Sequence, residues 1–152
     1  MKKTDDLKFM AEALNQAKEA AKAGEVPVGA VMVRNGELLA ANRNRREELK
    51  DASAHAEILL IRQVGAILGG WRLEACTLYV TLEPCPMCAG ALVLARLHRL
   101  VFGAPDSKAG AVVSLYDIVR DKRLNHNLKV SGGVMREECA SLLKEFFRQR
   151  RY

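Results

Sequence analysis

Residues 77–96 read TLYVTLEPCPMCAGALVLAR and join an apolar run, a proline-flanked Cys-x-x-Cys and a second apolar run. The pattern predicts a strand over residues 77–82 and a helix over residues 87–96. Cys85 and Cys88 should therefore lie where this strand ends and the helix begins.

Helices and strands alternate along the rest of the sequence. Thr4 can cap a first helix that ends near Gly24, with an apolar face made of Leu7, Met10, Leu14, Ala17 and Ala21. Asn35-Gly36 is the commonest dipeptide of a type I′ hairpin and should join two antiparallel strands. Further helices are predicted over residues 54–68, 114–119 and 137–150, and further strands over 27–33, 37–41, 99–102 and 128–130. We expect an α/β fold whose mixed sheet is covered on both faces, with the functional site at the strand ends.

Three residues have the chemistry and spacing of a zinc site. Cys85 and Cys88 converge at the first turn of the predicted helix, where free N–H groups and the helix dipole lower the pKa of a thiol. His55 follows Ser53, a residue type that caps helices, and so should begin another helix. A structural zinc site uses four protein ligands, whereas a catalytic one uses about three and leaves a position for water. His55, Cys85 and Cys88 thus predict one catalytic Zn²⁺ per chain.

Glu57 follows His55 by two residues, a spacing that does not put both side chains on the same helical face. We therefore expect Glu57 beside the metal, where it would transfer protons. His-Ala-Glu followed by Pro-Cys-Pro-Met-Cys matches the signature of zinc-dependent deaminases.

Other interpretations fit each half of this motif. Cys-x-x-Cys alone also occurs in redox pairs and in structural zinc knuckles, and His-x-Glu often occurs by chance. Cys76 and Cys139 read as buried apolar thiols, with metal binding as the alternative. His98 has no companion at ligand spacing, so we expect it to be structural or exposed.

Length and composition fit one zinc-dependent deaminase domain over residues 1–152. The chain has 152 residues, of which 49% are hydrophobic and 28% charged, and no linker or repeat divides it. No run approaches the ~20 apolar residues of a membrane span. The four cysteines do not resemble a disulfide scaffold, so we expect a cytoplasmic protein with no membrane partner.

The formal net charge is +6, and the basic residues are grouped. Such a balance favours a polyanionic partner, with nucleic acid ahead of an acidic membrane, although basic side chains are also ordinary solvated surface. The groups comprise Arg43, Arg45 and Arg46, then Arg120, Lys122, Arg123 and Lys129, and finally Arg148, Arg150 and Arg151.

Beyond the zinc motif, the chain resembles the bacterial tRNA-specific adenosine deaminases. The likeness rests on residues 26–31, 44–45, 55–58, 77–91, 102–104, 106, 108, 125–126, 146–148 and 150–151. The metal motif alone is shared with cytidine, deoxycytidylate, guanine and riboflavin-pathway deaminases, so the other segments discriminate among these families. The resemblance implies a three-layer α/β/α cytidine-deaminase-like fold with a five-stranded mixed sheet and a homodimer. It also implies conversion of adenosine to inosine at the wobble position of a tRNA anticodon stem-loop.

The resemblance implies roles for individual residues as well. Asn44 would hydrogen-bond the purine, the N–H of Ala56 would reach its Watson–Crick edge, and Val28 would pack on the base. Asp106 would face a flanking ribose, and His126 would lie at the anticodon. RNA contacts would also come from the basic terminus, Arg148, Arg150 and Arg151. Simpler roles exist for three of them: a turn residue for Asn44, an Asx turn for Asp106 and a core strand position for Val28.

In the expected mechanism, zinc lowers the pKa of its water, and the resulting hydroxide attacks C6 of adenine. Glu57 accepts the water proton and returns it to the ring nitrogen and then to the leaving amine, so that ammonia departs. One rival is a deaminase of guanine or a cytosine nucleotide, which would have no use for the basic terminus. The other is a noncatalytic zinc or RNA-binding protein, which would leave Glu57 without a role. Val113 stands where the family usually has glycine, and together with Pro105 it leaves the shape of the loop around Gly110 open.

Overall fold

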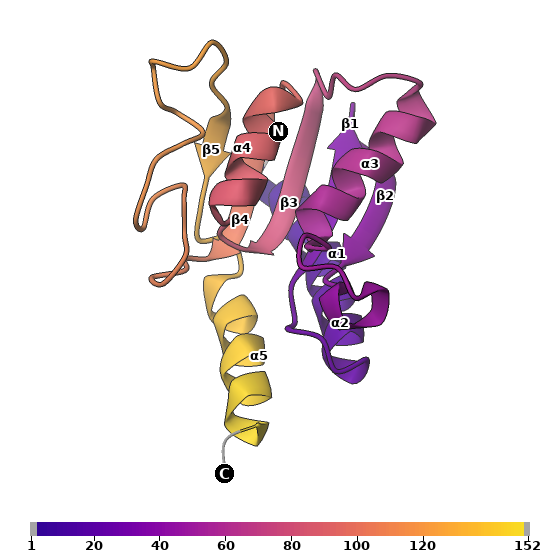
Figure 1. Cartoon of the computed structure of the whole chain (residues 1–152), viewed down its shortest axis with the longest axis vertical. Coiled ribbons are helices and arrows are strands. Elements are labelled where there is room, and N and C mark those ends of the chain that lie inside the picture. Colours follow the sequence, from indigo (N-terminus) through magenta and orange to yellow (C-terminus); the bar gives the residue numbers. More distant parts are fainter. Residues whose placement is uncertain (1–2, 151–152) are drawn as a thin grey trace.

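The computed structural model describes residues 3–150, which form a five-stranded sheet with helices on both faces (Figure 1). The strand order is β2-β1-β3-β4-β5, in which β1 is antiparallel to β2 and β3, whereas β3, β4 and β5 are parallel. The expected three-layer α/β fold with a five-stranded mixed sheet is confirmed. In chain order the elements are α1 (Lys3–Lys22), β1 (Gly29–Arg34), β2 (Glu37–Arg43), α2 (Arg46–Leu49), α3 (Ala56–Leu68), β3 (Cys76–Leu82), α4 (Pro86–Leu94), β4 (Arg99–Ala104), β5 (Lys129–Ser131) and α5 (Arg136–Gln149).

The hairpin between β1 and β2 forms at the predicted dipeptide. Asn35 and Gly36 have φ values of 52° and 78°, the positive values that a type I′ turn requires at both central positions. Arg34 and Glu37 pair on either side of the turn. This local turn makes the sheet mixed.

Alternate residues of the central strands supply two separate cores. Ala30 and Met32 of β1 belong to the cluster under α3 and α4, whereas Val31 and Val33 belong to the cluster under α1 and the first turns of α5. Figure 1 shows α3 and α4 in front of the sheet and α1 behind it. α3 and α4 pack on the same face, and their first turns lie at the same end of the sheet, because residues at the two helix starts are close together. Within residues 3–150, each helix is too short or too polar to cross a lipid bilayer.

The prediction of a helix over residues 114–119 is wrong. This segment runs through turns and irregular backbone. Its N–H groups have acceptors elsewhere: Ser114 donates to the carboxylate of Glu83, and Ile118 donates to the carbonyl of Ala111. These longer-range bonds replace the helical ones.

Two further details differ from expectation, and the short helix α2 was not predicted. Ser53 does not cap α3, because its N–H and hydroxyl both bind Oδ1 of Asp51, and His55 occupies the N-cap position instead. Leu7 is 47% exposed, so it does not belong to the apolar face of α1. That face is formed by Phe9, Met10, Ala13, Leu14, Ala17 and Ala20.

A buried ion pair attaches α1 to the sheet. Asp6 accepts two hydrogen bonds of 2.8 Å from the Arg99 guanidinium and one of 2.8 Å from the Tyr79 hydroxyl. Arg99 also donates to the hydroxyl of Ser131, so the network joins α1, β3, β4 and β5. The hydrogen bond from Arg99 lowers the pKa of Asp6 below its usual 3.8.

We expect Asp6→Asn to reduce the free energy of unfolding at pH 7 by about 3 kcal/mol, because it leaves Arg99 buried without its counter-charge. A carboxyl group with a lowered pKa contributes stability above its unfolded-state pKa and loses it as the pH falls. The difference between wild type and variant should therefore shrink below pH 3.8. Urea unfolding between pH 7 and pH 3 measures this difference, and a constant difference would contradict the ionic role of Asp6.

Candidate metal centre

The starts of two helices bring the three predicted metal ligands together. His55 is the N-cap residue of α3, Cys85 is the N-cap residue of α4, and Cys88 lies in the first turn of α4. Nδ1 of His55 is 3.7 Å from Sγ of Cys85 and 3.5 Å from Sγ of Cys88. All three ligand atoms lie within 4.8 Å of one another.

These distances fit a tetrahedral zinc ion. Zn–N bonds of about 2.0 Å and Zn–S bonds of about 2.3 Å at a tetrahedral angle place the nitrogen and each sulfur about 3.5 Å apart. Two thiolates and one imidazole are also the soft and borderline donors that zinc prefers. Cys88 is buried, whereas His55 and Cys85 are half-buried, so the centre is accessible from one side. Three protein ligands and an accessible side are the features of a catalytic zinc site.

The thiol of Cys85 is prepared to bind a cation. A hydrogen bond from Cys88, and then one from His55, lower the pKa of Cys85 to about 4. The pKa of Cys88 is raised instead, because its proton is shared with Cys85 and because it is buried. Metal binding therefore has to release the proton of Cys88, so the metal affinity of this centre should decrease at low pH.

Glu57 lies in the first turn of α3, beside the ligands, and is 3% exposed. Burial raises its pKa to about 7. A group with a pKa near neutrality accepts and returns protons readily at physiological pH.

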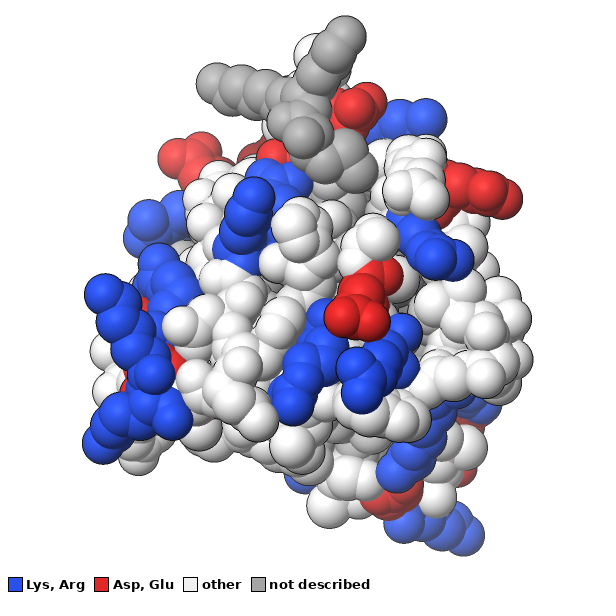
Figure 2. Space-filling model, turned by 90° about the horizontal axis from the view of Figure 1, so that it is seen from above, with Lys and Arg blue, Asp and Glu red and all other residues white. Residues whose placement is uncertain are grey.

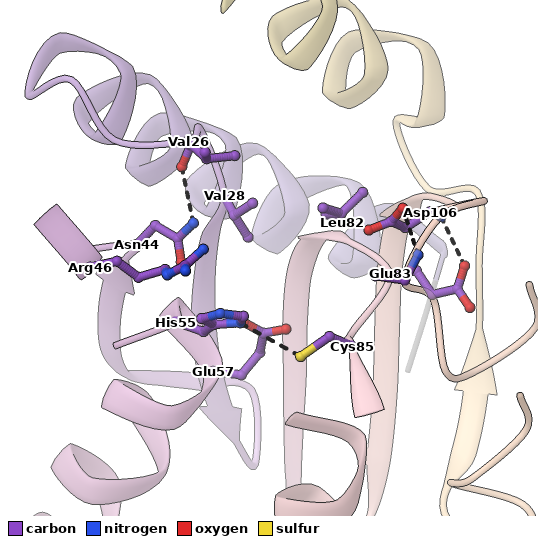
Figure 3. Close-up of a pocket in the computed structure, with 11 residues that line it drawn as sticks. Val26, Val28, Asn44, Arg46, His55, Glu57, Leu82, Glu83, Cys85 and Asp106 are labelled. Carbon is purple, nitrogen blue, oxygen red and sulfur yellow. Dashed lines mark hydrogen bonds between the residues drawn. The ribbon is translucent and has the colours of Figure 1, made fainter. Parts of the chain in front are cut away.

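The ligands and Glu57 open into a pocket at the ends of β1 and β3. Figure 3 shows Asn44 and Arg46 on one side of the pocket and Glu83 and Asp106 on the other, with His55 and Cys85 between them. The lining comprises Val26, Val28, Asn44, Arg46, His55, Glu57, Leu82, Glu83, Cys85, Asp106 and Ala109.

Asn44 is held in the wall of this pocket by its backbone and its side chain. Its N–H donates to the carbonyl of Val28 at 3.0 Å, and its Nδ2 donates to the carbonyl of Val26 at 3.3 Å. The second N–H of the amide and Oδ1 have no partner among residues 3–150. Asn44 is only 6% exposed, so these groups can serve a ligand that enters the pocket.

The opposite wall is the loop that follows β4. Oδ1 of Asp106 accepts the N–H groups of Lys108 and Ala109, so this residue forms the Asx turn that was its simpler interpretation. The N–H of Asp106 donates to the buried carboxylate of Glu83 at 2.9 Å. Burial alone would raise the pKa of Glu83, but hydrogen bonds from Ser114, Val113 and Asp106 lower it to about 2.

The remaining predicted residues divide between the site and other regions. Ala56 is the first residue of α3, where its N–H has no helical acceptor. His126 does not line the pocket: its Nε2 is 2.7 Å from the carbonyl of Leu97, at the end of the sheet where β4 and β5 begin. Arg148 pairs with Glu145 on α5, Arg150 stacks on the Phe146 ring, and Arg151 lies outside the described residues.

The sequence did not identify Arg46, Glu83, Val26, Leu82 or Ala109 as pocket residues. Arg46 follows Asn44 by two positions, and this spacing was the available indication that it lines the pocket. Cys76, Cys139 and His98 lie outside the metal cluster, and both cysteines are buried as expected. Figure 2 shows the face seen from above the sheet, where Lys and Arg form several separate groups instead of one continuous patch.

Comparisons with known proteins agree on one family. The model of the MafB19-like deaminases matches residues 4–151. The tRNA-specific adenosine deaminase of Bacillus subtilis (strain 168) is 51% identical over 148 residues, which cover 97% of this chain and 92% of that protein. A structure from a study of A-to-I editing by tRNA:A34 deaminases at the wobble position of transfer RNA has a TM-score of 0.86 and 45% identity, covering 90% of this chain and 99% of that one. A guanine deaminase from Nitrosomonas europaea has a TM-score of 0.81 and 25% identity, covering 92% and 83%.

Removal of one thiolate should empty the metal centre. We expect purified Cys88→Ala to contain far less than one zinc per chain, because two protein ligands seldom hold a zinc ion. Cys76→Ala is the matched control, since it removes another buried thiol outside the cluster, and it should retain one zinc. Atomic emission measures both contents, and full zinc in Cys88→Ala would reveal a further protein ligand.

Proposed function

Because this chain belongs to the MafB19-like deaminases and, within them, to the tRNA-specific adenosine deaminases, we propose that it converts adenosine to inosine at the wobble position of a tRNA anticodon loop. The observation that carries this proposal is the cluster of His55, Cys85 and Cys88 with Glu57 beside it, at the floor of a pocket that Asn44 lines. The whole chain, residues 1–152, acts as one zinc-dependent deaminase domain.

His55, Cys85 and Cys88 hold the zinc, one ion per chain. When bound, zinc makes a water molecule acidic enough to act as a nucleophile at neutral pH. In the overall exchange, an oxygen atom from water replaces the exocyclic amino group at C6 of adenine, and this group leaves as ammonia.

Glu57 transfers the protons that this exchange requires. It accepts one proton from the water and donates it to the ring nitrogen next to C6. It then accepts the second proton from the oxygen on C6 and donates it to the leaving amino group. Its burial supports this role, because a carboxyl group with a pKa of about 7 exists in both protonation states near neutrality.

The pocket walls orient the base. Val28 packs on the purine, Asn44 hydrogen-bonds it with the groups that Val26 leaves unused, and the N–H of Ala56 reaches its Watson–Crick edge. C6 of a stacked and paired adenine is inaccessible to a buried metal centre, so the substrate must be unstacked. An anticodon loop offers such bases at low energetic cost.

RNA outside the pocket contacts the loop of Asp106 and the basic C-terminus. Arg148 is 75% exposed even though it pairs with Glu145, and exposed pairs of this kind are weak enough to be replaced by a phosphate contact. Arg150 and Arg151 extend this basic end, and His126 serves RNA that reaches beyond the pocket.

The protein acts as a homodimer in the cytoplasm, where bacterial tRNA is found. Met87 and Leu94, seven residues apart, share one exposed face of α4, and Leu94 is 72% exposed. The loop after β4 adds more exposed apolar side chains, Val113, Leu115, Tyr116 and Leu124. Exposed apolar side chains of this kind support association with a second copy.

The decisive test of the substrate compares four adenosines. We expect inosine to form in an anticodon stem-loop with wobble adenosine much faster than in the same strand annealed into a duplex, in free adenosine, or at another adenosine of the loop. Mass spectrometry of the digested RNA measures each product. Similar rates on all four, or faster release of ammonia from guanine or cytidine, would favour a small-molecule deaminase.

Glu57→Ala separates proton transfer from metal binding. The variant should retain one zinc per chain and lose about 10²–10⁴-fold or more in kcat on the stem-loop, because a positioned proton donor and acceptor contributes on this scale. Zinc content and single-turnover rates measure the two effects. Loss of zinc would contradict the assignment of Glu57 as a residue that does not bind the metal.

A further inference from the structure

Glu83 is a buried carboxylate that neither binds the metal nor faces an ion-pair partner. It follows the last residue of β3 and precedes the Pro84-Cys85 step by one position, and it is 2% exposed. Its charge is balanced by N–H and O–H donors of one loop, residues 105–114. Burial of a charge in this way requires that its hydrogen bonds be nearly complete.

Both ends of this loop bind the same carboxylate. Oε2 accepts three consecutive N–H groups, from Val112 at 2.9 Å, Val113 at 2.7 Å and Ser114 at 2.9 Å. Oε1 accepts the N–H of Asp106 at 2.9 Å and the hydroxyl of Ser114. These five bonds fix where the loop begins and where it ends.

Gly110 allows the loop to close over the carboxylate. A Cβ at this position would lie 2.4 Å from Cδ and Oε1 of Glu83 and 2.5 Å from the carbonyl oxygen of Asp106. No side chain fits into that space. The loop therefore depends on Glu83 for its bonds and on Gly110 for its close approach.

The loop is also one wall of the pocket, through Asp106 and Ala109. Glu83 lies two residues before Cys85, so it links this wall directly to the segment that carries a metal ligand. Asn44, in the opposite wall, is held by Val26 and Val28 instead. Figure 3 shows the bond between Glu83 and Asp106 on the side of the pocket away from Asn44.

We propose that Glu83 is a positioning residue for the deamination, which holds the Asp106 wall at a fixed distance from the metal centre. The inference rests on the proposed function, since it assigns Glu83 a role in that same reaction. Although Glu83 lines the pocket, donors of the loop occupy both of its carboxylate oxygens, so it acts through the loop. Val113 donates its backbone N–H to Glu83 without a positive φ, so this position of the loop does not require a glycine.

Glu83→Gln tests the role with little change in shape. The amide places N–H groups against N–H donors, so part of the loop must detach. We expect one zinc per chain, faster hydrogen exchange at the amides of residues 112–114, and a fall of about 10- to 100-fold in kcat/KM on the stem-loop, mainly through KM. Gly110→Ala displaces the loop without altering Glu83 and should give the same pattern.

A double-mutant cycle distinguishes positioning from general stability. Glu83→Gln combined with Asp106→Ala should lose little more kcat/KM than the worse single variant, because both act through one wall. Asn44→Ala is the control variant in the opposite wall. When Glu83→Gln is combined with it, the two losses in kcat/KM should multiply. All rates are measured well below the unfolding temperature of each variant.

Multiplied losses for Glu83→Gln with Asp106→Ala, unchanged kcat/KM in Glu83→Gln, or loss of its zinc would each overturn the proposal. Unchanged exchange at residues 112–114 would overturn it independently of any activity. A wild-type protein without activity on the stem-loop would refute the proposed function and this role in it together. If the wild type is active but the losses in kcat/KM of Glu83→Gln and Asp106→Ala multiply, only the role of Glu83 is refuted.

Discussion

The structure depends on the convergence of two helix starts at one end of the sheet. His55 begins α3, and Cys85 and Cys88 begin α4, so their ligand atoms can lie within 4.8 Å only if both helices pack on the same face and in the same direction. The alternating apolar residues of β1 and β3 enforce that packing, because one half of each strand is buried under α3 and α4. The free N–H groups and dipoles of two helix starts then favour the negative charge of the thiolates.

Two buried glutamates at this site have pKa values shifted in opposite directions, because they differ in the hydrogen-bond donors around them. Burial outweighs the two donors of Glu57, its own backbone N–H and the Cys88 thiol, so its pKa rises to about 7 and it can exchange protons. Glu83 is buried among donors, so despite burial its pKa falls to about 2 and it remains a fixed charge. A third buried carboxylate, Glu25, accepts the N–H groups of Glu47 and Glu48 at 3.0 and 2.8 Å and holds α2 beside Asn44. Within residues 3–150, Glu57, the proposed proton carrier, is thus the carboxylate that no other residue's backbone N–H holds, whereas Glu25 and Glu83 accept such N–H groups from the walls around it.

The sequence predicted the features that depend on local patterns and missed those that depend on contacts between distant residues. The strands, the Asn35-Gly36 turn and the grouping of three ligands follow from apolar periodicity, turn chemistry and short spacings. Residues 114–119 were predicted to form a short helix, but their backbone is tied to Glu83 and Ala111, and neither contact is predictable from a local pattern. Arg46 and Glu83 were missed for the same reason, since only the folded sheet brings residues 37 positions apart in sequence to opposite walls of one pocket.

The proposed chemistry requires a zinc ion that is held by three protein atoms and keeps one position for water. X-ray absorption at the zinc edge of the purified protein measures the atoms bound to the zinc directly. We expect two sulfur ligands at about 2.3 Å and two lighter ligands at about 2.0–2.2 Å, one from His55 and one from an exchangeable oxygen. A third sulfur, or four protein ligands, would make the zinc site structural and would contradict a catalytic zinc.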